Sequence, residues 1–499
     1  MDADVIVVGA GPVGLLLAGE LRLGGAEVTV VERLTTPMTE SRASTLHARS
    51  MEILEQRGLF DGLETPPNLP AGHFGGIRLD LSQQPSRFPG QWKLAQADLE
   101  RLLADWARGM GTRILRGYDV RTVTSSEDAV EIGVHTARGP KRLRAAHVVG
   151  CDGDQSSVRR LASFDFPGLP ATRELFRCDL TGVDIPDRRF ERFEDGLAIA
   201  ATRDGVTRVM VHEFGRWPVR RTSAPEFTEV ASAWKRVTGE DITGGAATWV
   251  DAFDNASRQV SRYQQGRMLL AGDAAHRQMP VGGMPLNVGL QDAMNLGWKL
   301  AAVVQGWAPV GLLGTYDAER RPAGRQALHM IDAQAHLLLG GPEVDAVRAV
   351  LTRLIELPAV RDELAAMVGG LDVRYEQGDR LDGARLPYAV LETASRSTTT
   401  TELLRAGRGV LLDLSGDQTR GDGLEQLIQD VPGAVKTERA TVPDGSPLAG
   451  IDTILVRPDG HVAWTGDCDS DPTAALCRWF GAVKEGRYSP ARSGSAHDT

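Results

Sequence analysis

The chain has 499 residues, which is enough for two or three packed units rather than one ordinary domain. Its 42% hydrophobic and 24% charged residues are typical of a soluble globular protein, and they exclude a disordered chain and a membrane-spanning class. The net charge of −10 and the acidic start at Asp2 argue against nucleic acid and membrane partners and against a signal peptide, so we expect a cytoplasmic protein.

The cysteines lie far apart in the sequence, without a CxxC motif or a Cys/His spacing that would suit a metal ion. They are Cys151, Cys178, Cys468 and Cys477. We therefore expect neither a disulfide framework nor a metal site.

The N-terminal segment DVIVVGAGPVGLLLAGELRLGGAEVTVVER predicts a strand at residues 5–8, a glycine-rich turn, a helix, and a strand at residues 28–31 that ends at Glu32. In such a turn the glycines permit the tight bend, the approach of the backbone to a pyrophosphate, and close helix–strand packing. Glu32 can accept hydrogen bonds from a ribose hydroxyl, which favours NAD or FAD over NADP; a turn without a ligand is the alternative. The residues predicted to line the cofactor are Gly9, Gly11, Pro12, Val13 and Gly14.

Three arginines follow the second strand and lead into a helix predicted around residues 50–56. Arg33, Arg42 and Arg49 could reach a pyrophosphate, or they could lie on a solvated loop. Further along, VVGCDGDQSSVRRLA is a short apolar run that ends at Asp152-Gly153 before a short helix, and it predicts a second turn near phosphate.

Alternating apolar runs, such as GLAIAATRDGVTRVMVHEF at residues 196–214, predict an antiparallel sheet between residues 175 and 267. The chain then reads LLAGDAAHRQMPVGGMPLNVGLQDAMNLGWKLAAVV, which predicts a strand, a loop and a helix. Further helices follow, and the Thr/Ser run ETASRSTTTTELLRAGRG after residue 390 suggests a linker or exposed loop. Short strands and a helix come next, and residues 489–499 are expected to be disordered.

With these motifs in order, the chain resembles the FAD-dependent aromatic hydroxylases, the single-component (group A) flavoprotein monooxygenases, over nearly its whole length. The fingerprints are the GxGxxG turn with Glu32, the DG motif CDGDQSSVR, and the GD motif LLAGDAAH followed by Pro280. Segments such as ESRASTLHARSMEILEQRGL and GHFGG are similar to bacterial hydroxylases that tailor aromatic polyketides of the angucycline and anthracycline kind in antibiotic biosynthesis.

The resemblance implies an α/β fold with a Rossmann-like FAD-binding domain of the para-hydroxybenzoate-hydroxylase type, an antiparallel-sheet substrate domain and a C-terminal thioredoxin-like domain. Without a CxxC motif the last domain should be structural. The expected limits are 1–174 and 268–390 for the two parts of the FAD-binding domain with its helices, 175–267 for the sheet, 391–488 for the thioredoxin-like domain, and 489–499 for the tail.

The resemblance also implies residue roles. Glu32 would hold the adenosine ribose with Arg33 next to it, Arg42 and Gln96 would lie along the pyrophosphate and ribityl region, and Asp273 after Gly272 would accept from a ribityl hydroxyl. Asp152 and Gly153 would be shared with a transiently bound nicotinamide cofactor. His276 is interpreted as a backbone-satisfied histidine rather than an acid or base. His73, Phe74, Phe214 and Trp217 are candidate substrate contacts, with core packing or a surface position as the alternative for each.

One loop departs from the family pattern, Pro-x-Gly-Gly-Gln-Gly, at Met284 and Pro285. Its backbone would face the flavin and stabilise negative charge on the reduced ring. Proline is tolerated in the first helical turn, but it removes one N–H donor and biases Met284 toward an extended backbone. The loop residues assigned to the flavin are Pro280, Gly282, Gly283, Met284, Pro285, Leu286 and Asn287.

The chemistry implied is reduction of FAD by NADPH or NADH, reaction with O2 to a C4a-hydroperoxide, and transfer of its distal OH to an electron-rich aromatic ring. The sequence assigns no catalytic base. The alternatives are another flavin-dependent oxidoreductase, such as a Baeyer–Villiger enzyme, an oxidase or a reductase, and a non-catalytic flavin-binding partner protein. The oligomeric state stays open, with a homodimer as one option.

Overall fold

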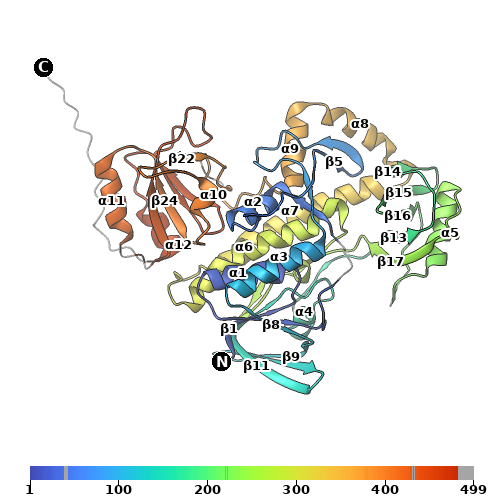
Figure 1. The fold of residues 1–499 in the computed structure, drawn as a ribbon, viewed down its shortest axis with the longest axis horizontal. Coiled ribbons are helices and arrows are strands. Elements are labelled where there is room, and N and C mark those ends of the chain that lie inside the picture. Colours follow the sequence, from blue (N-terminus) through green and yellow to red (C-terminus); the bar gives the residue numbers. More distant parts are fainter. Residues whose placement is uncertain are drawn as a thin grey trace.

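The structure is a computed structural model that describes residues 1–38, 43–219, 221, 223–376, 378, 380–429, 431 and 433–481. Its N-terminal part is built on an eight-stranded sheet in which the order along one path is β19-β20-β11-β1-β2-β8, and β10 and β9 extend from β11 as a ribbon (Figure 1). The central strands are parallel. The bounds are β1(Ala3–Val8), β2(Val28–Glu32), β8(Arg113–Arg116), β9(Asp119–Ser125), β10(Val130–Thr136), β11(Gly139–Gly150), β19(Gln264–Gln265) and β20(Met268–Leu270).

Helices cover this sheet, and three of them, α1, α3 and α6, lie side by side (Figure 1). Glycines allow the close approach: a Cβ built on Gly297 would lie 2.4 Å from the Cβ of Glu20, and one on Gly19 would lie 1.9 Å from the ring of Trp106. The helix predicted around residues 50–56 is confirmed as α2. The bounds are α1(Pro12–Leu23), α2(Ala48–Gln56), α3(Gln96–Gly109), α4(Ser157–Leu161), α6(Met284–Val304), α7(Gly314–Leu339), α8(Asp345–Ile355) and α9(Pro358–Gly369).

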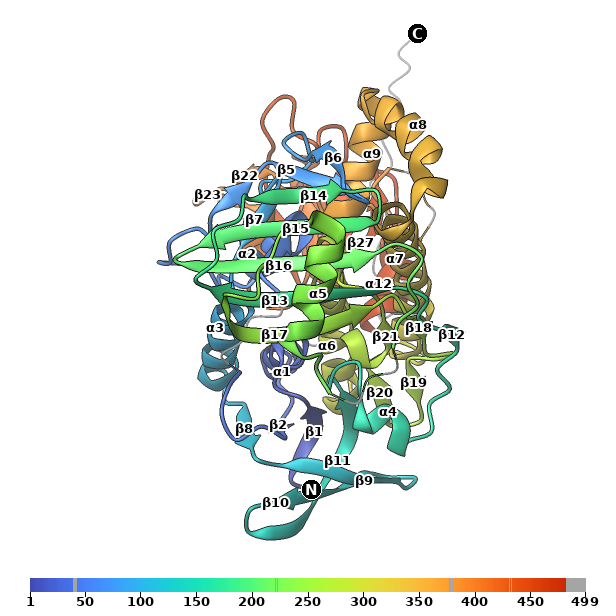
Figure 2. The same ribbon diagram turned by 90° about the vertical axis from the view of Figure 1, so that its right-hand side faces the viewer.

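The antiparallel sheet expected in the middle of the chain is confirmed, with the strand order β14-β15-β16-β13-β17. Its outer face packs on α5(Phe227–Thr238) around Trp234 (Figure 2), and its other face packs on α7. The strands are β13(Glu174–Thr181), β14(Arg188–Arg192), β15(Gly196–Arg203), β16(Val206–Glu213) and β17(Ala246–Asp254).

Small strands fill the space between the sheet of β13 to β17 and the N-terminal part. β3(Thr45–His47) and β4(Asn68–Leu69) both pair with β7(Gln91–Lys93), and β5(Ala71–Phe74) pairs with β6(Ile77–Asp80). Three short strands pair in the order β12-β18-β21 and form a small sheet between the two large ones. Their bounds are β12(Gly168–Leu169), β18(Ser257–Gln259) and β21(His276–Arg277).

The C-terminal domain has the strand order β25-β24-β26-β27, with β24 and β25 parallel and the other pairs antiparallel, which is the arrangement expected for a thioredoxin-like fold. The expected linker is wrong: the Thr/Ser run forms the hairpin β22(Val390–Glu392)–β23(Ser397–Thr399), and Thr399 caps α10(Thr400–Leu403). The expected disordered tail lies outside the described residues. The bounds are β24(Gly409–Asp413), α11(Gln418–Ile428), β25(Val435–Arg439), β26(Thr453–Val456), β27(Val462–Gly466) and α12(Thr473–Phe480).

The turn between β26 and β27 fastens this domain to the rest of the protein. Arg457 donates to Glu319 on α7 at 2.6 and 2.9 Å, and both side chains are buried. Arg49 on α2 donates to the carbonyl of Asp459 at 3.0 Å. The suggestion that Arg49 reaches a pyrophosphate is therefore wrong. Its guanidinium is buried at the interface with the C-terminal domain, where it bonds to Asp459, 410 positions further along the chain.

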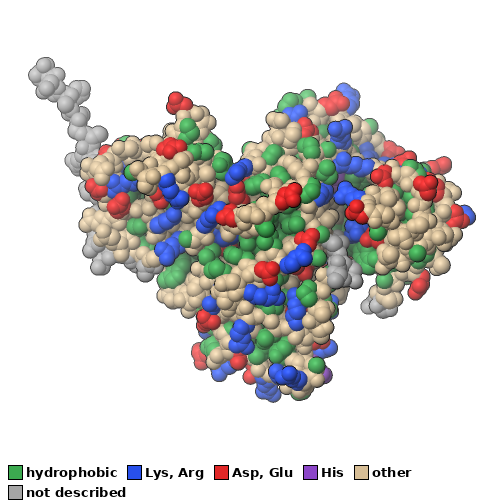
Figure 3. All heavy atoms as spheres, in the orientation of Figure 1, with side chains coloured by type: hydrophobic (Ala, Val, Ile, Leu, Met, Phe, Trp, Pro, Cys, Tyr) green, Lys and Arg blue, Asp and Glu red, His purple; other side chains and the backbone are tan. Residues whose placement is uncertain are grey.

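Acidic and basic side chains are interspersed over the face shown in Figure 3. Among the described helices, none combines the length and the apolar character needed to cross a bilayer.

Candidate active site

Three turns meet at the carboxyl ends of β1, β11 and β20: the GxGxxG turn, the DG turn and the GD turn. Val13 lies at their junction. A Cβ built on Gly272 would approach its side chain to 3.1 Å, and a Cβ on Gly289 of α6 would approach it to 2.7 Å. The motifs that the sequence separates by more than 100 residues therefore form one continuous surface.

The glycines of these turns have two different jobs. A Cβ on Gly9 would lie 2.4 Å from the Cys151 carbonyl oxygen, and a Cβ on Gly14 would lie 2.1 Å from the Gly9 carbonyl oxygen, so both serve packing. A Cβ on Gly11 or on Gly153 would meet no atom within 4 Å. Gly11 also precedes α1 without a side-chain cap. An open backbone at a helix N-terminus, next to Pro12, fits a pyrophosphate.

Glu32 is anchored beside this turn. Its two carboxylate oxygens accept from the N–H groups of Ala10 at 2.8 Å and Leu34 at 2.9 Å. A carboxylate has lone pairs beyond these two, so Glu32 can also accept from ribose hydroxyls. Arg33 is exposed in the turn that follows, and Arg42 lies outside the described residues.

Gln96, at the start of α3, holds the edge of the same region. Its side-chain oxygen accepts from the N–H of Ala43 at 3.1 Å, and its amide nitrogen donates to Glu100 at 2.9 Å. The side chain therefore fixes the backbone that leads into β3.

Asp152 contains a buried polar atom without a protein partner. Its Oδ2 accepts from the N–H groups of Ser157 at 2.6 Å and Val158 at 3.1 Å, at the start of α4. Its Oδ1 is buried and has no hydrogen-bond partner among the described atoms. Burial raises the pKa of this carboxyl group. An unpaired buried oxygen beside Gly153 fits a ligand with hydroxyl or N–H donors.

The GD turn is held by a buried carboxylate on α6. Asp292 accepts from the Gly272 N–H at 3.0 Å, from His276 at 2.9 Å and from Arg320 at 2.7 Å. Burial alone would raise the pKa of Asp292, but Arg320 and His276 together lower it. The expectation that backbone groups satisfy His276 is wrong: this fully buried ring bonds to the Asp292 carboxylate and, at 3.3 Å, to the Gln278 side chain. Asp273, three residues earlier, is exposed.

The loop before α6 turns through two left-handed glycines, Gly282 (φ 62°) and Gly283 (φ 79°). The first four N–H groups of a helix have no partner inside it. Here the N–H groups of Gly283 and Met284 donate back to the carbonyls of Pro280 and Val281, and Pro285 has no N–H. The amide of Leu286 is then the donor that this helix start can offer to a ligand.

Met284 does not have the extended backbone that Pro285 was expected to impose. Its φ of −59° and ψ of −41° are helical. Its side chain is 4% exposed, packs with Phe74 and Val281, and accepts a hydrogen bond from Gln334 through sulfur at 3.4 Å. Burial of this side chain outweighs the steric bias of the following proline.

Asn287 and two histidines brace this loop. Asn287 accepts from the His47 N–H at 2.8 Å and donates to the carbonyls of Thr45 at 3.1 Å and Gly283 at 2.8 Å, so its side chain joins β3 to α6. His47 donates from Nε2 to the Gly282 carbonyl at 2.8 Å. His73 accepts the Gly76 N–H at Nδ1, and its Nε2 lies 3.9 Å from a Cβ built on Gly282. Burial lowers the pKa of His47 to about 4 and that of His73 to about 3, so both rings are neutral near pH 7.

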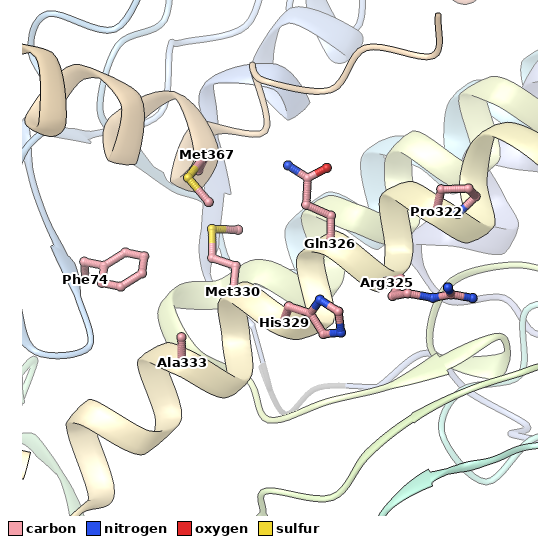
Figure 4. Close-up of a pocket in the computed structure, with 8 residues that line it drawn as sticks. All are labelled: Phe74, Pro322, Arg325, Gln326, His329, Met330, Ala333 and Met367. Carbon is pink, nitrogen blue, oxygen red and sulfur yellow. The ribbon is translucent and has the colours of Figure 1, made fainter.

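The four candidate substrate residues fall into two groups. Phe74 lines a cavity of about 470 Å³, together with Met330 of α7 and Met367 of α9 (Figure 4), and the buried His73 precedes it on β5. Phe214 and Trp217 line another cavity, of about 440 Å³, at the end of β16, where Trp217 is 70% exposed. Phe74 shares an apolar cluster with Met284 of the segment that leads into α6, residues 280–287, which we call the flavin loop. The first cavity therefore lies next to the flavin loop.

The sequence did not point to His47, Lys93 or the arginines of β14 and β15. β3 and β7 have three residues each, too few for a periodic pattern. In the sequence, His47 and Lys93 could have been noticed only as a histidine and a lysine within short, partly apolar segments.

Comparisons with known proteins agree with this geometry. Residues 2–330 match the family described as FAD binding domain, and residues 379–483 match the family described as aromatic-ring hydroxylase, C-terminal. A relative from Streptomyces rimosus subsp. rimosus, 12-dehydrotetracycline 5-monooxygenase/anhydrotetracycline 6-monooxygenase, is 37% identical over 96% of this chain and 99% of its own.

Solved structures are similar over the same length. CabE, an aromatic hydroxylase from angucycline biosynthesis, is 45% identical with a TM-score of 0.92 and covers 97% of this chain and 100% of its own. The Diels-Alderase PyrE3 of pyrroindomycin biosynthesis is 35% identical with a TM-score of 0.85 over 96% and 99%. This chain belongs to the FAD-dependent aromatic hydroxylases, the group A flavoprotein monooxygenases, with FAD as cofactor and NAD(P)H as electron donor.

Proposed function

We propose that this monooxygenase hydroxylates a polycyclic aromatic polyketide. The observation that carries the proposal is the cavity beside Phe74, which adjoins the flavin loop through the apolar cluster of Phe74 and Met284. Its size of about 470 Å³ and its apolar side chains Phe74, Met330 and Met367 suit a flat ring system. The same lining includes side chains that can bond to polar substituents: Arg325, Gln326 and His329. The names of the tetracycline and angucycline relatives support this substrate class.

The FAD would lie along the three turns. Glu32 would accept from the adenosine ribose, the open backbone at Gly11 would face the pyrophosphate, and Asp273 would accept from the ribityl chain. Asp152, whose Oδ1 has no partner among the described atoms, would accept from a donor of the bound cofactor. The isoalloxazine ring would rest at the start of α6, where Leu286 supplies an N–H.

Bound FAD, reduced by NAD(P)H, supplies the activation of O2. The protein would have two tasks: the Leu286 N–H at the start of α6 would face the ring with positive backbone dipole, and the apolar side chains of Phe74 and Met284 would keep water away from it. The neutral rings of His47 and His73 hold the loop without adding charge.

The direct test is turnover of candidate polyketides with NADPH or NADH under ¹⁸O2. Hydroxylation adds one labelled oxygen as OH to the product. Insertion of the label into a C–C bond would identify a Baeyer–Villiger enzyme instead, and a product without added oxygen would contradict monooxygenation.

A second candidate is supported by the similarity to PyrE3, named a Diels-Alderase. In that case the same apolar cavity would bind a polyene and promote ring closure without redox chemistry. Product formation under anaerobic conditions, without NAD(P)H, would favour cyclisation. The absence of both cyclisation and flavin reduction would leave a non-catalytic flavin-binding role.

A further inference from the structure

The amine of Lys93 lies close to the flavin loop. It ends β7, directly across from Thr45 on β3, and its Nζ donates to the Thr45 hydroxyl at 2.8 Å. Thr45 in turn touches the loop, because a Cβ built on Gly283 would lie 3.1 Å from the Thr45 Cβ. The amine is therefore separated from the start of α6 by one side chain.

Two exposed arginines of the substrate sheet, Arg189 and Arg203, are close enough for their charges to act on Lys93. Arg203 ends β15, and Arg189 lies in an irregularity of β14, where the pairing with β15 shifts register. Arg189 donates to the carbonyls of Ala71 at 3.1 Å and Gly72 at 3.4 Å. The next residue, Phe190, has a φ of 55° and places its ring 4.3 Å from that of His73. A bulky residue in this region of backbone space is strained, so packing holds β14 against β5 here.

The charges around Lys93 are all of one sign. Burial, together with the charges of Arg203 and Arg189, lowers the pKa of Lys93 to about 8. His47 and His73 face the same group from β3 and β5 and are neutral. Arg188, next to Arg189 on β14, pairs with Glu191 and Glu240, whereas no ion pair among the described residues involves Lys93, Arg189 or Arg203.

Lys299 shows what a structural buried lysine looks like in the same protein. The pKa of Lys299 is also lowered to about 8 by burial, but its Nζ contacts Glu319 at 2.7 Å and Asn295 at 2.8 Å. Lys93, by contrast, is a half-buried amine next to the flavin loop and near two guanidinium groups, and no carboxylate among the described residues pairs with it. A bound anion would complete it.

We propose that Lys93 takes the proton of the substrate's phenolic hydroxyl and, with Arg189 and Arg203, holds the resulting phenolate beside the flavin loop. This proposal rests on the proposed hydroxylase function. The phenol O–H bond breaks, an N–H bond forms on Lys93, and the electron pair stays on oxygen, so the total charge of the pair is unchanged. The phenolate oxygen raises electron density at the ortho and para carbons, where the incoming oxygen is electrophilic. Lys93 returns its proton to solvent before the next turnover.

The test measures ionisation rather than turnover. The FAD-loaded enzyme is titrated with 2-hydroxyanthraquinone as a probe, and difference spectra between pH 6 and 10 report its phenol and phenolate forms. A cation at contact distance lowers the pKa of an acidic partner by roughly 1–3 units. We expect the bound probe to have a phenolate-to-phenol ratio about tenfold or more above that of the free probe at the same pH.

Two variants of Lys93 separate the roles. Lys93→Met keeps the aliphatic stem and removes the amine, and it should lower the ratio toward that of the free probe, while Arg189 and Arg203 remain. Lys93→Arg keeps a cation that does not deprotonate, so it should keep the bound phenolate. It should also lose the rise of kcat/KM with pH near 8 that a lysine base produces. Lys141→Met removes an exposed lysine on β11 and is the matched control, with an unchanged ratio.

Three outcomes overturn the proposal. They are an unshifted or absent probe spectrum with the unmodified enzyme, an unchanged ratio in Lys93→Met, and a Lys93→Met enzyme whose only defect is a raised KM for NAD(P)H in anaerobic flavin reduction. The last would assign the cations to the dinucleotide. A shifted ratio without oxygen incorporation into any phenol would leave the phenolate site in place and contradict the hydroxylase function.

Discussion

Arg457 and Glu319 are 138 positions apart in the chain and form a bidentate ion pair, with N–O distances of 2.6 and 2.9 Å, across the boundary of the C-terminal domain. Lys299 also contacts Glu319, at 2.7 Å. The carboxylate therefore sits between two buried cations, and together they lower the pKa of Glu319 to about 2 although burial opposes it.

Replacing Arg457 by Met should destabilise the protein by about 3–5 kcal/mol, because removal of one partner leaves a buried charge incompletely paired. Urea denaturation of the FAD-loaded protein measures the change. Arg142→Met is the control, since the Arg142–Glu131 pair is exposed and should contribute no more than about 1 kcal/mol. Equal effects of the two substitutions would contradict a buried anchoring role.

The two kinds of glycine in the first turn should respond differently to alanine. Gly11→Ala adds a methyl group to open space, at a φ of −77° that alanine adopts. It should leave the apoprotein stable and weaken FAD binding about tenfold or more, since one charge-assisted hydrogen bond of roughly 1.5–3 kcal/mol already accounts for that factor. Gly14→Ala should destabilise the apoprotein, because its methyl group would meet the Gly9 carbonyl. Calorimetric titration with FAD and thermal unfolding of the apoprotein separate these effects; matching profiles would contradict the assignment.

The Met284-Pro285 pair can be divided into a packing part and an electrostatic part. Pro285→Gly restores an N–H in the first turn of α6, and an added hydrogen bond to reduced flavin should raise its midpoint potential by about 30 mV or more. Met284→Gln disturbs a buried contact with Gln334, so it should lower stability and leave the potential nearly unchanged. Spectroelectrochemical titration gives the potentials, and the ratio of product to NAD(P)H consumed gives the coupling. No change of either quantity in Pro285→Gly would contradict a functional reading of the proline.

Acid should destabilise the protein through its buried histidines. Their pKa values are lowered in the folded state by burial, from 6.5 to about 4 for His47, His147 and His461 and to about 3 for His73. Below pH 6.5 the unfolded chain binds protons that the folded chain does not, so stability present above pH 6.5 is lost as the pH falls toward 4. For a shift of this size the loss per histidine is about 2 kcal/mol at pH 5.

Denaturation at several pH values between 7 and 4.5 measures this slope. His147 lies on β11, away from the flavin loop, and its Nδ1 is buried without a partner among the described atoms. His147→Gln should therefore reduce the slope by up to about one proton, or 1.4 kcal/mol per pH unit, without affecting FAD binding. An unaltered slope in this variant would contradict the shift.

Local patterns predicted the turn of Gly9, Gly11 and Gly14, the antiparallel sheet and the long helix after Gly283, because each has a period or a spacing that short-range physics imposes. The contacts that complete the site have no such signal. The bond from His47 to Gly282 joins positions 235 apart. The Thr/Ser run after residue 390 was misread for a related reason: turn-forming composition does not reveal whether a partner strand buries Leu391. Arg49 shows the converse, since a cation near a phosphate-binding motif has its partner in another domain.

The docking of the Pro458–Asp459 turn onto α2 bears on how the protein can be divided. Arg49, Gln56 and Arg57 all donate to carbonyls of that turn, and β3 with Thr45 and His47 leads directly into the same helix. A fragment ending near Leu371 would expose these donors and release the strand that contacts Gly282. We therefore expect the FAD-binding part to depend on the C-terminal domain for its structure. Although it carries no cofactor motif, the C-terminal domain holds α2 and β3, which contact the loop where the flavin ring would lie.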